Sequence, residues 1–182
     1  MKTLLVVAGL VLLPQATAQA SVVTIGSSAA RTCYLAASTL RSDDNAIRVC
    51  NSALQTVELS AQDRLATHNN RGVLYLMGKK IDAASRDFDA AMAIDPVQPE
   101  AWLNKSVALH NAGLTREAMV LATRALELRT RKPALAYFVR GLGHEAGGNV
   151  RAAYADLVRA RDLDPRWAEP AEELRRYRVV RN

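Results

Sequence analysis

The sequence is poor in the residues on which several protein classes depend. Of its 182 residues only 5% are aromatic, and it holds two cysteines, nine glycines and six prolines. Two cysteines are too few for a disulfide-framework miniprotein, and so little glycine and proline excludes collagen and disfavours a turn-rich β-sandwich. With 49% apolar residues, the chain is too hydrophobic for intrinsic disorder. Its abundant alanine and leucine favour helix.

The longest hydrophobic run lies at the N-terminus. Lys2 precedes ten apolar residues, and a small-x-small triplet that signal peptidase could cut ends at Ala20. Ten residues are too few to span a bilayer, so we interpret residues 1–20 as a cleavable signal peptide. The alternatives are cleavage after Ala18 and an uncleaved anchor. We expect a periplasmic or secreted protein that is not transmembrane after cleavage, with residues 21–27 as a flexible tail.

A pattern of small residues recurs every 34 or 35 residues in the rest of the chain. Three series of small residues begin at Gly72, Ser106 and Gly141. In each series, small residues follow the first one after 12 and after 19 positions. This spacing predicts two antiparallel helices per unit. We expect first helices at 65–78, 99–112 and 134–147, and second helices at 82–95, 116–129 and 151–164.

These residues resemble the tetratricopeptide repeat (TPR) family. The resemblance rests on Gly72, Tyr75, Ala84, Phe88, Ala91 and Pro96, then Trp102, Ala118 and Ala125, then Gly141, Ala153, Ala160 and Pro165. Ala122 and Thr130 depart from the family pattern. The resemblance implies an all-α, TPR-type α-solenoid of antiparallel helix pairs with repeats at 65–98, 99–132 and 134–167.

Two weaker elements flank these repeats. Residues 28–60 are interpreted as a degenerate first repeat, because similar steps from Tyr34 again reach small residues. Residues 168–182 are predicted to form a C-terminal capping helix, extending to about Val180, and a tail. The expected N-caps of the second helices are Asp82, Thr115 and Asn149.

Both cysteines fall in the degenerate repeat. Cys33 lies on its expected first helix and Cys50 on its second, and an even count in an exported chain favours a disulfide between them. Closing a loop of about 17 residues is worth roughly 3 kcal/mol from chain entropy. The alternative is two free thiols in the core.

Two repeats carry a basic residue 16 positions before an acidic one. We interpret these as structural ion pairs between the helices of one repeat: Arg71 with Asp87, and Arg140 with Asp156. The alternative is a ligand-binding column of Arg71, Lys105 and Arg140. Lys105 stands opposite Leu121 in its own repeat, so we expect it to be the free cation of the three.

The resemblance implies that a ligand binds in a concave groove lined by the first helices. The groove positions are mostly apolar, with a few polar groups: Asn69, Val73, Leu76, Leu103, Val107, His110, Phe138 and Leu142. Such a surface suits a helix or an extended peptide. The alternative is that the chain's own terminal helix fills the groove.

No motif in the sequence favours catalysis. The three histidines have no metal-ligand spacing, so we expect no metal, no other cofactor and no enzymatic activity. Basic residues gather near 124–132 and 175–181 without interleaved aromatics, so nucleic acid is not an expected partner. We predict a protein- or peptide-binding scaffold or adaptor in the cell envelope. The alternative is a binder of anionic envelope polymer or lipid surface through the basic face.

Overall fold

The structure, a computed structural model, describes residues 28–39, 43–55 and 59–178. Within these ranges every regular element is an α-helix. The helices are α1 (Ser28–Ser38), α2 (Asp44–Leu54), α3 (Ala61–Met77), α4 (Ile81–Ile94), α5 (Pro99–Asn111), α6 (Thr115–Glu127), α7 (Pro133–Ala146), α8 (Val150–Leu163) and α9 (Ala168–Leu174). The predicted signal peptide and tail, residues 1–27, lie outside the described residues.

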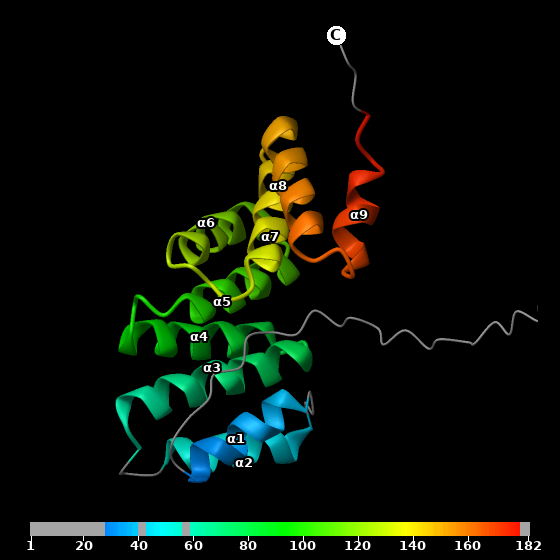
Figure 1. Cartoon of the computed structure of the whole chain (residues 1–182). Helices are drawn as coiled ribbons and strands as arrows, with labels where there is room; N and C mark the ends of the chain where they lie inside the picture. Colours follow the sequence, from blue (N-terminus) through cyan, green and yellow to red (C-terminus); the bar gives the residue numbers. More distant parts are fainter. Residues whose placement is uncertain (1–27, 40–42, 56–58, 179–182) are drawn as a thin grey trace, which may run out of the picture.

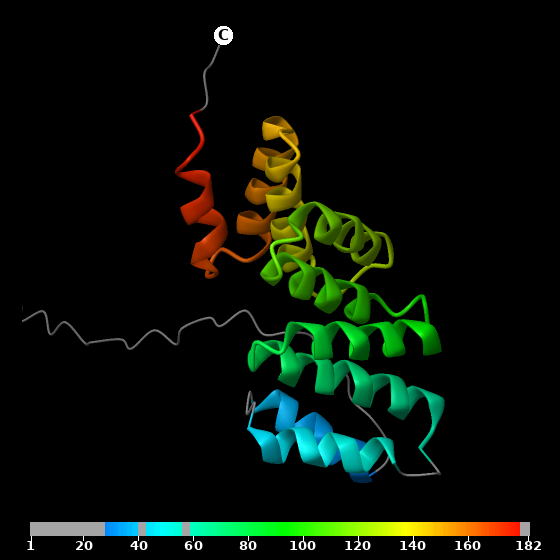
Figure 2. The ribbon, with the colours of Figure 1, turned by 180° about the vertical axis from the view of Figure 1, so that it is seen from behind.

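The helices stack in chain order (Figure 1). Each helix packs on its immediate neighbours in sequence, and the first helices α1, α3, α5 and α7 also contact one another in succession. The view from behind shows the same order, with the helix axes turning between the α3–α4 pair and the α7–α8 pair (Figure 2). The predicted all-α solenoid is therefore confirmed. Among the helices described, none is both long and apolar enough to cross a membrane.

The turn inside each of the three regular pairs is built on a left-handed residue. These residues are Lys79 (φ 57°), Gly113 (φ 82°) and Gly148 (φ 77°). In each turn the next residue donates its backbone N–H to the carbonyl five positions earlier, as Lys80 does to Tyr75 at 2.8 Å. This is the Schellman ending, which satisfies carbonyls that the helix end would leave unpaired.

One of the three predicted N-caps is correct. The Asn149 side chain accepts a hydrogen bond from the backbone N–H of Ala152 and so caps α8. Asp82 and Thr115 instead lie inside the first turns of α4 and α6, which begin one residue earlier than predicted. The N-cap position after each left-handed residue holds Lys80 or Leu114 in these two turns, and neither side chain makes a capping hydrogen bond as Asn149 does.

The helix bounds differ from prediction at both edges of the regular repeats. α3 begins at Ala61, four residues early, because the Ser60 hydroxyl accepts a hydrogen bond from the Asp63 N–H at 3.0 Å. α9 ends at Leu174, so the predicted helix to about Val180 is wrong. Three of the four described residues beyond Leu174 are arginines, so a further turn would have little apolar surface to bury.

Small residues set how closely the two helices of a repeat approach. A Cβ on Gly72 would meet the Phe88 ring at 2.5 Å, whereas one on Gly141 would meet Leu157 at 3.2 Å. In the middle repeat Ala122 stands where the other two have a large residue, and the buried Ser106 replaces the glycine. The smaller side chain at Ala122 on α6 is therefore partly compensated by the larger side chain at Ser106 on α5.

Candidate partner-binding surface

The residues of each predicted ion pair lie together between the two helices of their repeat. Arg71 Nε and Nη2 donate to Asp87 Oδ2 and Oδ1 at 2.7 and 2.6 Å. Arg140 holds Asp156 in the same way, at 2.7 and 2.8 Å. Both contacts are bidentate, and the Asp87 and Asp156 side chains are only 6% and 10% exposed. Such geometry fixes the register of the helices it joins.

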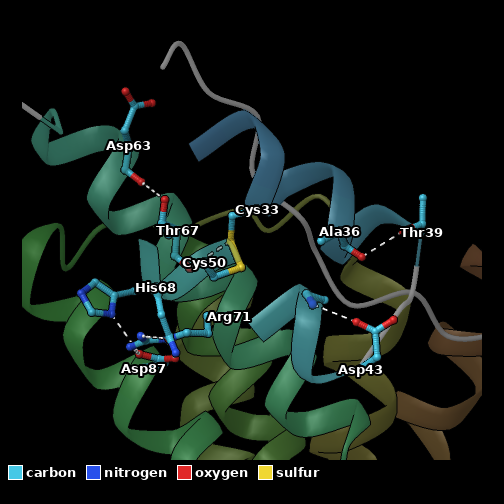
Figure 3. Close-up of a disulfide and its surroundings, with 12 residues drawn as sticks. Cys33, Ala36, Thr39, Asp43, Cys50, Asp63, Thr67, His68, Arg71 and Asp87 are labelled. Atoms are coloured by element: carbon cyan, nitrogen blue, oxygen red, sulfur yellow. Dashed lines mark hydrogen bonds and ion pairs between the residues drawn. A yellow bond between two sulfur atoms is a disulfide. The ribbon is translucent and has the colours of Figure 1, made fainter. Parts of the chain in front are cut away.

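Asp87 also binds a residue that the 16-residue spacing does not predict. His68 Nδ1 lies 2.9 Å from Asp87 Oδ1, and Arg71 Nη1 donates to Asn51 Oδ1 at 2.7 Å. Figure 3 shows His68, Arg71 and Asp87 converging beside the disulfide. The network joins α2, α3 and α4, so it links the degenerate repeat to the first regular one.

The network shifts the pKa values of its charged members. Burial alone would raise the pKa of Asp87, but hydrogen bonds from Arg71 and His68 outweigh it and hold that pKa below its usual value. Burial would lower the pKa of Arg71, but the hydrogen bond and charge of Asp87 raise it overall. Both groups therefore remain charged at neutral pH.

Lys105 is not the free cation that the sequence predicts. Its Nζ pairs with Asp89, which lies on α4 of the preceding repeat. Leu121 does remove the acidic partner within the same repeat, but Asp89 from the repeat before takes its place. All three members of the basic column therefore contact a carboxylate, which favours the structural interpretation over a ligand-binding column.

A disulfide joins Cys33 of α1 to Cys50 of α2. Both residues are fully buried, and Cys33 Sγ lies 3.9 Å from the carbonyl oxygen of Thr67 in α3 (Figure 3). The cross-link therefore ties the two helices of the degenerate repeat at the side that packs on the next repeat.

Five of the eight predicted groove residues are partly exposed. We call this set the first-helix face: Leu76, Val107, His110, Phe138 and Leu142. The other three have no exposed surface: Asn69, Val73 and Leu103. These three cannot contact a ligand in this structure, so their predicted place in the groove is corrected.

The three buried residues hold successive first helices together. Asn69 Oδ1 accepts a hydrogen bond from Asn104 Nδ2 at 3.0 Å, between α3 and α5. Val73 shares a buried cluster with Ala108 of α5, and Leu103 shares one with Ala136 of α7. Alanine at the facing position lets the next helix approach until it covers the larger side chain.

The C-terminal segment covers one end of the first-helix face. The Trp167 ring packs edge-on against Phe138, with centroids 4.8 Å apart. Burial lowers the pKa of His110, and the charge of Glu173 on α9 partly offsets that shift, so α9 lies within electrostatic reach of α5. Both ribbon views show α9 beside α8, on which it packs (Figures 1 and 2). The sequence leaves open whether the terminal segment covers the groove, and in the structure it covers Phe138.

The three histidines lie apart, each beside a different partner. His68 contacts Asp87, His110 Nδ1 lies 3.2 Å from Thr115 Oγ1, and His144 Nε2 lies 3.7 Å from Asp156. Within the described ranges no three histidine, cysteine or acidic side chains gather in a way that could hold a metal ion. These contacts give each histidine a structural neighbour within its own repeat.

Comparison with known proteins supports the fold. No family model and no curated protein matches the chain. The first TPR domain of Spaghetti (RPAP3), solved bound to the HSP90 peptide SRMEEVD, is 25% identical with a TM-score of 0.58, over 66% of this chain and 94% of that one. The APC/C hetero-tetramer Cut9–Hcn1 is 22% identical with a TM-score of 0.61, over 80% of this chain and 27% of that one. The chain has the tetratricopeptide-repeat fold, as its repeat pattern predicts.

Proposed function

We propose that the protein is a non-enzymatic scaffold that binds a protein or peptide partner on the first-helix face. The observation that carries this proposal is the row of partly exposed, mainly apolar side chains on three successive first helices, α3, α5 and α7. A helix or extended segment laid along the stack could contact side chains from all three. The structurally similar RPAP3 domain is bound to a peptide, which supports this use of the fold.

Two valine substitutions test the proposal, and circular dichroism must first show that both variants are folded, because Val107 also packs against the buried cluster of Ala118, Ala122 and Val139. Val107 belongs to the first-helix face, whereas Val120 is 63% exposed on the second helix α6. A partner isolated by crosslinking from the envelope fraction of the producing cells is then titrated against purified variants. We expect Val107→Glu to weaken binding at least tenfold, because it places a charge in an apolar contact, and Val120→Glu to change it less than twofold. The reverse pattern would reject the first-helix face as the binding surface.

Exposed arginines on the second helices favour one other candidate function. They recur 35 residues apart on α6 and α8: Arg116 with Arg151, and Arg124 with Arg159. This arrangement supports binding of an anionic envelope polymer or lipid surface. Polymer binding should collapse between low and moderate salt, whereas binding to the apolar first-helix face should persist. A salt series on the isolated partner therefore separates the two functions.

We infer export to the periplasm or beyond from residues 1–20, which lie outside the described part of the chain. The buried disulfide between Cys33 and Cys50 supports this, because disulfides persist in oxidising compartments. Mass spectrometry of the protein from its producing cells should find a mature N-terminus at Ser21. An intact N-terminus on cytosolic protein would contradict export.

A further inference from the structure

The C-terminal segment 167–177, which we call the strap, contains an unpaired polar group. Trp167 Nε1 is a buried side-chain donor without a hydrogen-bond partner, whereas Tyr177 of the strap has Glu145 within hydrogen-bonding reach. Buried polar atoms in folded proteins are nearly always paired, because leaving one unpaired is costly. The strap is therefore held in place at the expense of a missing hydrogen bond at Trp167.

The strap is a short element that packs on α8. α9 spans seven residues, too short to persist as an isolated helix, and Pro170 is its buried residue. Arg176 pairs with Glu145 of α7, but the arginine side chain is 58% exposed, and exposed ion pairs hold weakly. Two aromatic contacts therefore carry most of the attachment. Trp167 is only 6% exposed and packs on Phe138, and the Tyr177 ring packs on Tyr154 of α8, with centroids 5.7 Å apart.

The strap lies where a ligand of the first-helix face would lie. Phe138 is a member of that face and contacts the Trp167 ring directly. His110, a second member, experiences the charge of Glu173 in the strap. The structure thus shows what the α7 end of the face binds: an aromatic side chain, followed nine residues later by an arginine that reaches Glu145.

We propose that the strap is a built-in pseudo-ligand, which a segment of a partner protein with the same chemistry displaces. The partner segment presents an aromatic side chain to Phe138 and a basic side chain to Glu145. Displacement returns the Trp167 N–H to water, where it regains a hydrogen bond, so part of the cost of release is offset. This inference rests on the proposed function of the first-helix face.

The test uses the full-length chain and a fluorescein-labelled peptide with the strap sequence, residues 166–178. In the unaltered chain the tethered strap competes with the peptide at a high effective concentration. Trp167→Ala weakens the tethered strap and leaves the surface intact, so it should bind the peptide at least tenfold more tightly than the unaltered chain. The matched control is Trp102→Ala, whose indole N–H donates to the Pro96 carbonyl and not to the strap. This control should not raise the affinity.

Adding Phe138→Ala to the Trp167→Ala chain should abolish binding of the labelled peptide. If the Trp167→Ala chain is helical by circular dichroism yet binds the peptide no better than the unaltered chain, the proposal is overturned. Hydrogen exchange on the unaltered chain gives an independent readout that needs no variant. Strap amides should exchange at least a hundredfold faster than those of α7 and α8, and equal protection would also reject the proposal.

The strap proposal can fail while the proposed function stands. The function is tested at Val107 with the natural partner, and Val107 has no part in the peptide experiment. Loss of partner binding in Val107→Glu together with equal peptide binding by both chains would leave a scaffold whose strap is a fixed cap.

Discussion

At the scale of single residues, one carboxylate accompanies each cation of the basic column, but it does not always come from the same repeat. Asp87 and Asp156 lie on the second helix of the repeat that carries the arginine, whereas Asp89 reaches Lys105 from the repeat before. The difference lies in burial. The Asp87 side chain is 6% exposed and that of Asp89 is 54% exposed, although the two residues share one helix.

This contrast predicts unequal effects of two substitutions only two residues apart. Asp87→Asn should destabilise the protein by about 2–4 kcal/mol, because it leaves a largely buried guanidinium without its counter-charge. Asp89→Asn should cost less than about 1 kcal/mol, because its ion pair is solvated. Urea denaturation followed by circular dichroism measures both. Equal losses would mean that the Arg71–Asp87 network does not set the register of α3 and α4.

The lowered pKa of Asp87 predicts how that difference depends on pH. A carboxyl group whose pKa is lower in the folded state contributes its stability above the unfolded pKa, and loses it as pH falls through the folded pKa. The stability gap between the unaltered protein and Asp87→Asn should be full above about pH 4 and should narrow at lower pH. Denaturation series at several acidic pH values would show this. A gap that widens on acidification would contradict the pKa direction.

Two glycine substitutions test how the helices of a repeat approach each other. Gly72→Ala should destabilise by about 1–2 kcal/mol, because the new Cβ collides with the Phe88 ring and the gain in helix propensity offsets only part of the strain. Gly141→Ala should cost less than about 1 kcal/mol, because the new Cβ would meet Leu157, the Ala153 carbonyl oxygen and Asp156 at 3.2–3.3 Å, so that α8 needs to shift by only a few tenths of an ångström. Thermal melts of both variants measure the difference. Similar losses would place the steric conflict elsewhere.

Sequence reasoning located the Arg71 network only in part, for a physical reason. The 16-residue spacing within one repeat correctly pairs Arg71 with Asp87. It contains no information about partners from neighbouring repeats, so the prediction that Lys105 is free is wrong. His68 could have been found, since it lies three residues before Arg71 on the same side of a helix. The burial of Asn69 could not have been predicted from the sequence, because it depends on how closely α3 and α5 approach each other.

At the scale of helices, the periodic elements were predictable and their ends were not. The 34-residue repeat specifies the identity and order of α3 to α8, because small and large residues alternate where two helices must pack. Helix ends depend on single hydrogen bonds and on turn geometry. Ser60 therefore extends α3, and the Schellman turns move the starts of α4 and α6, against the prediction.

The disulfide acts on one helix pair, and its removal should have a local effect. Replacing both Cys33 and Cys50 by alanine should lower the stability of the α1–α2 pair by roughly 3 kcal/mol, because the loop between them regains its freedom in the unfolded state. Hydrogen exchange should accelerate in α1 and α2 and remain unchanged in α5 to α8, since repeats in a solenoid depend chiefly on their neighbours. Uniform acceleration along the chain would show instead that the stack unfolds as one unit.

At the scale of the whole molecule, the stack presents two different long surfaces. The first helices carry the partly exposed apolar residues of the first-helix face, and the second helices α6 and α8 carry exposed arginines. The strap covers the first-helix face at Phe138 on α7. A partner that first contacts Leu76 on α3 could therefore extend along the stack and displace the strap last.

Site-specific photo-crosslinking in the producing cells tests the central claim most directly. A photoreactive phenylalanine analogue is placed in turn at Leu76, at Val107 and, as the exposed control on α6, at Val120. Binding on the first-helix face predicts that one and the same partner is captured from Leu76 and Val107 and not from Val120. Capture from Val120 alone would contradict this account and would place the partner on the second helices.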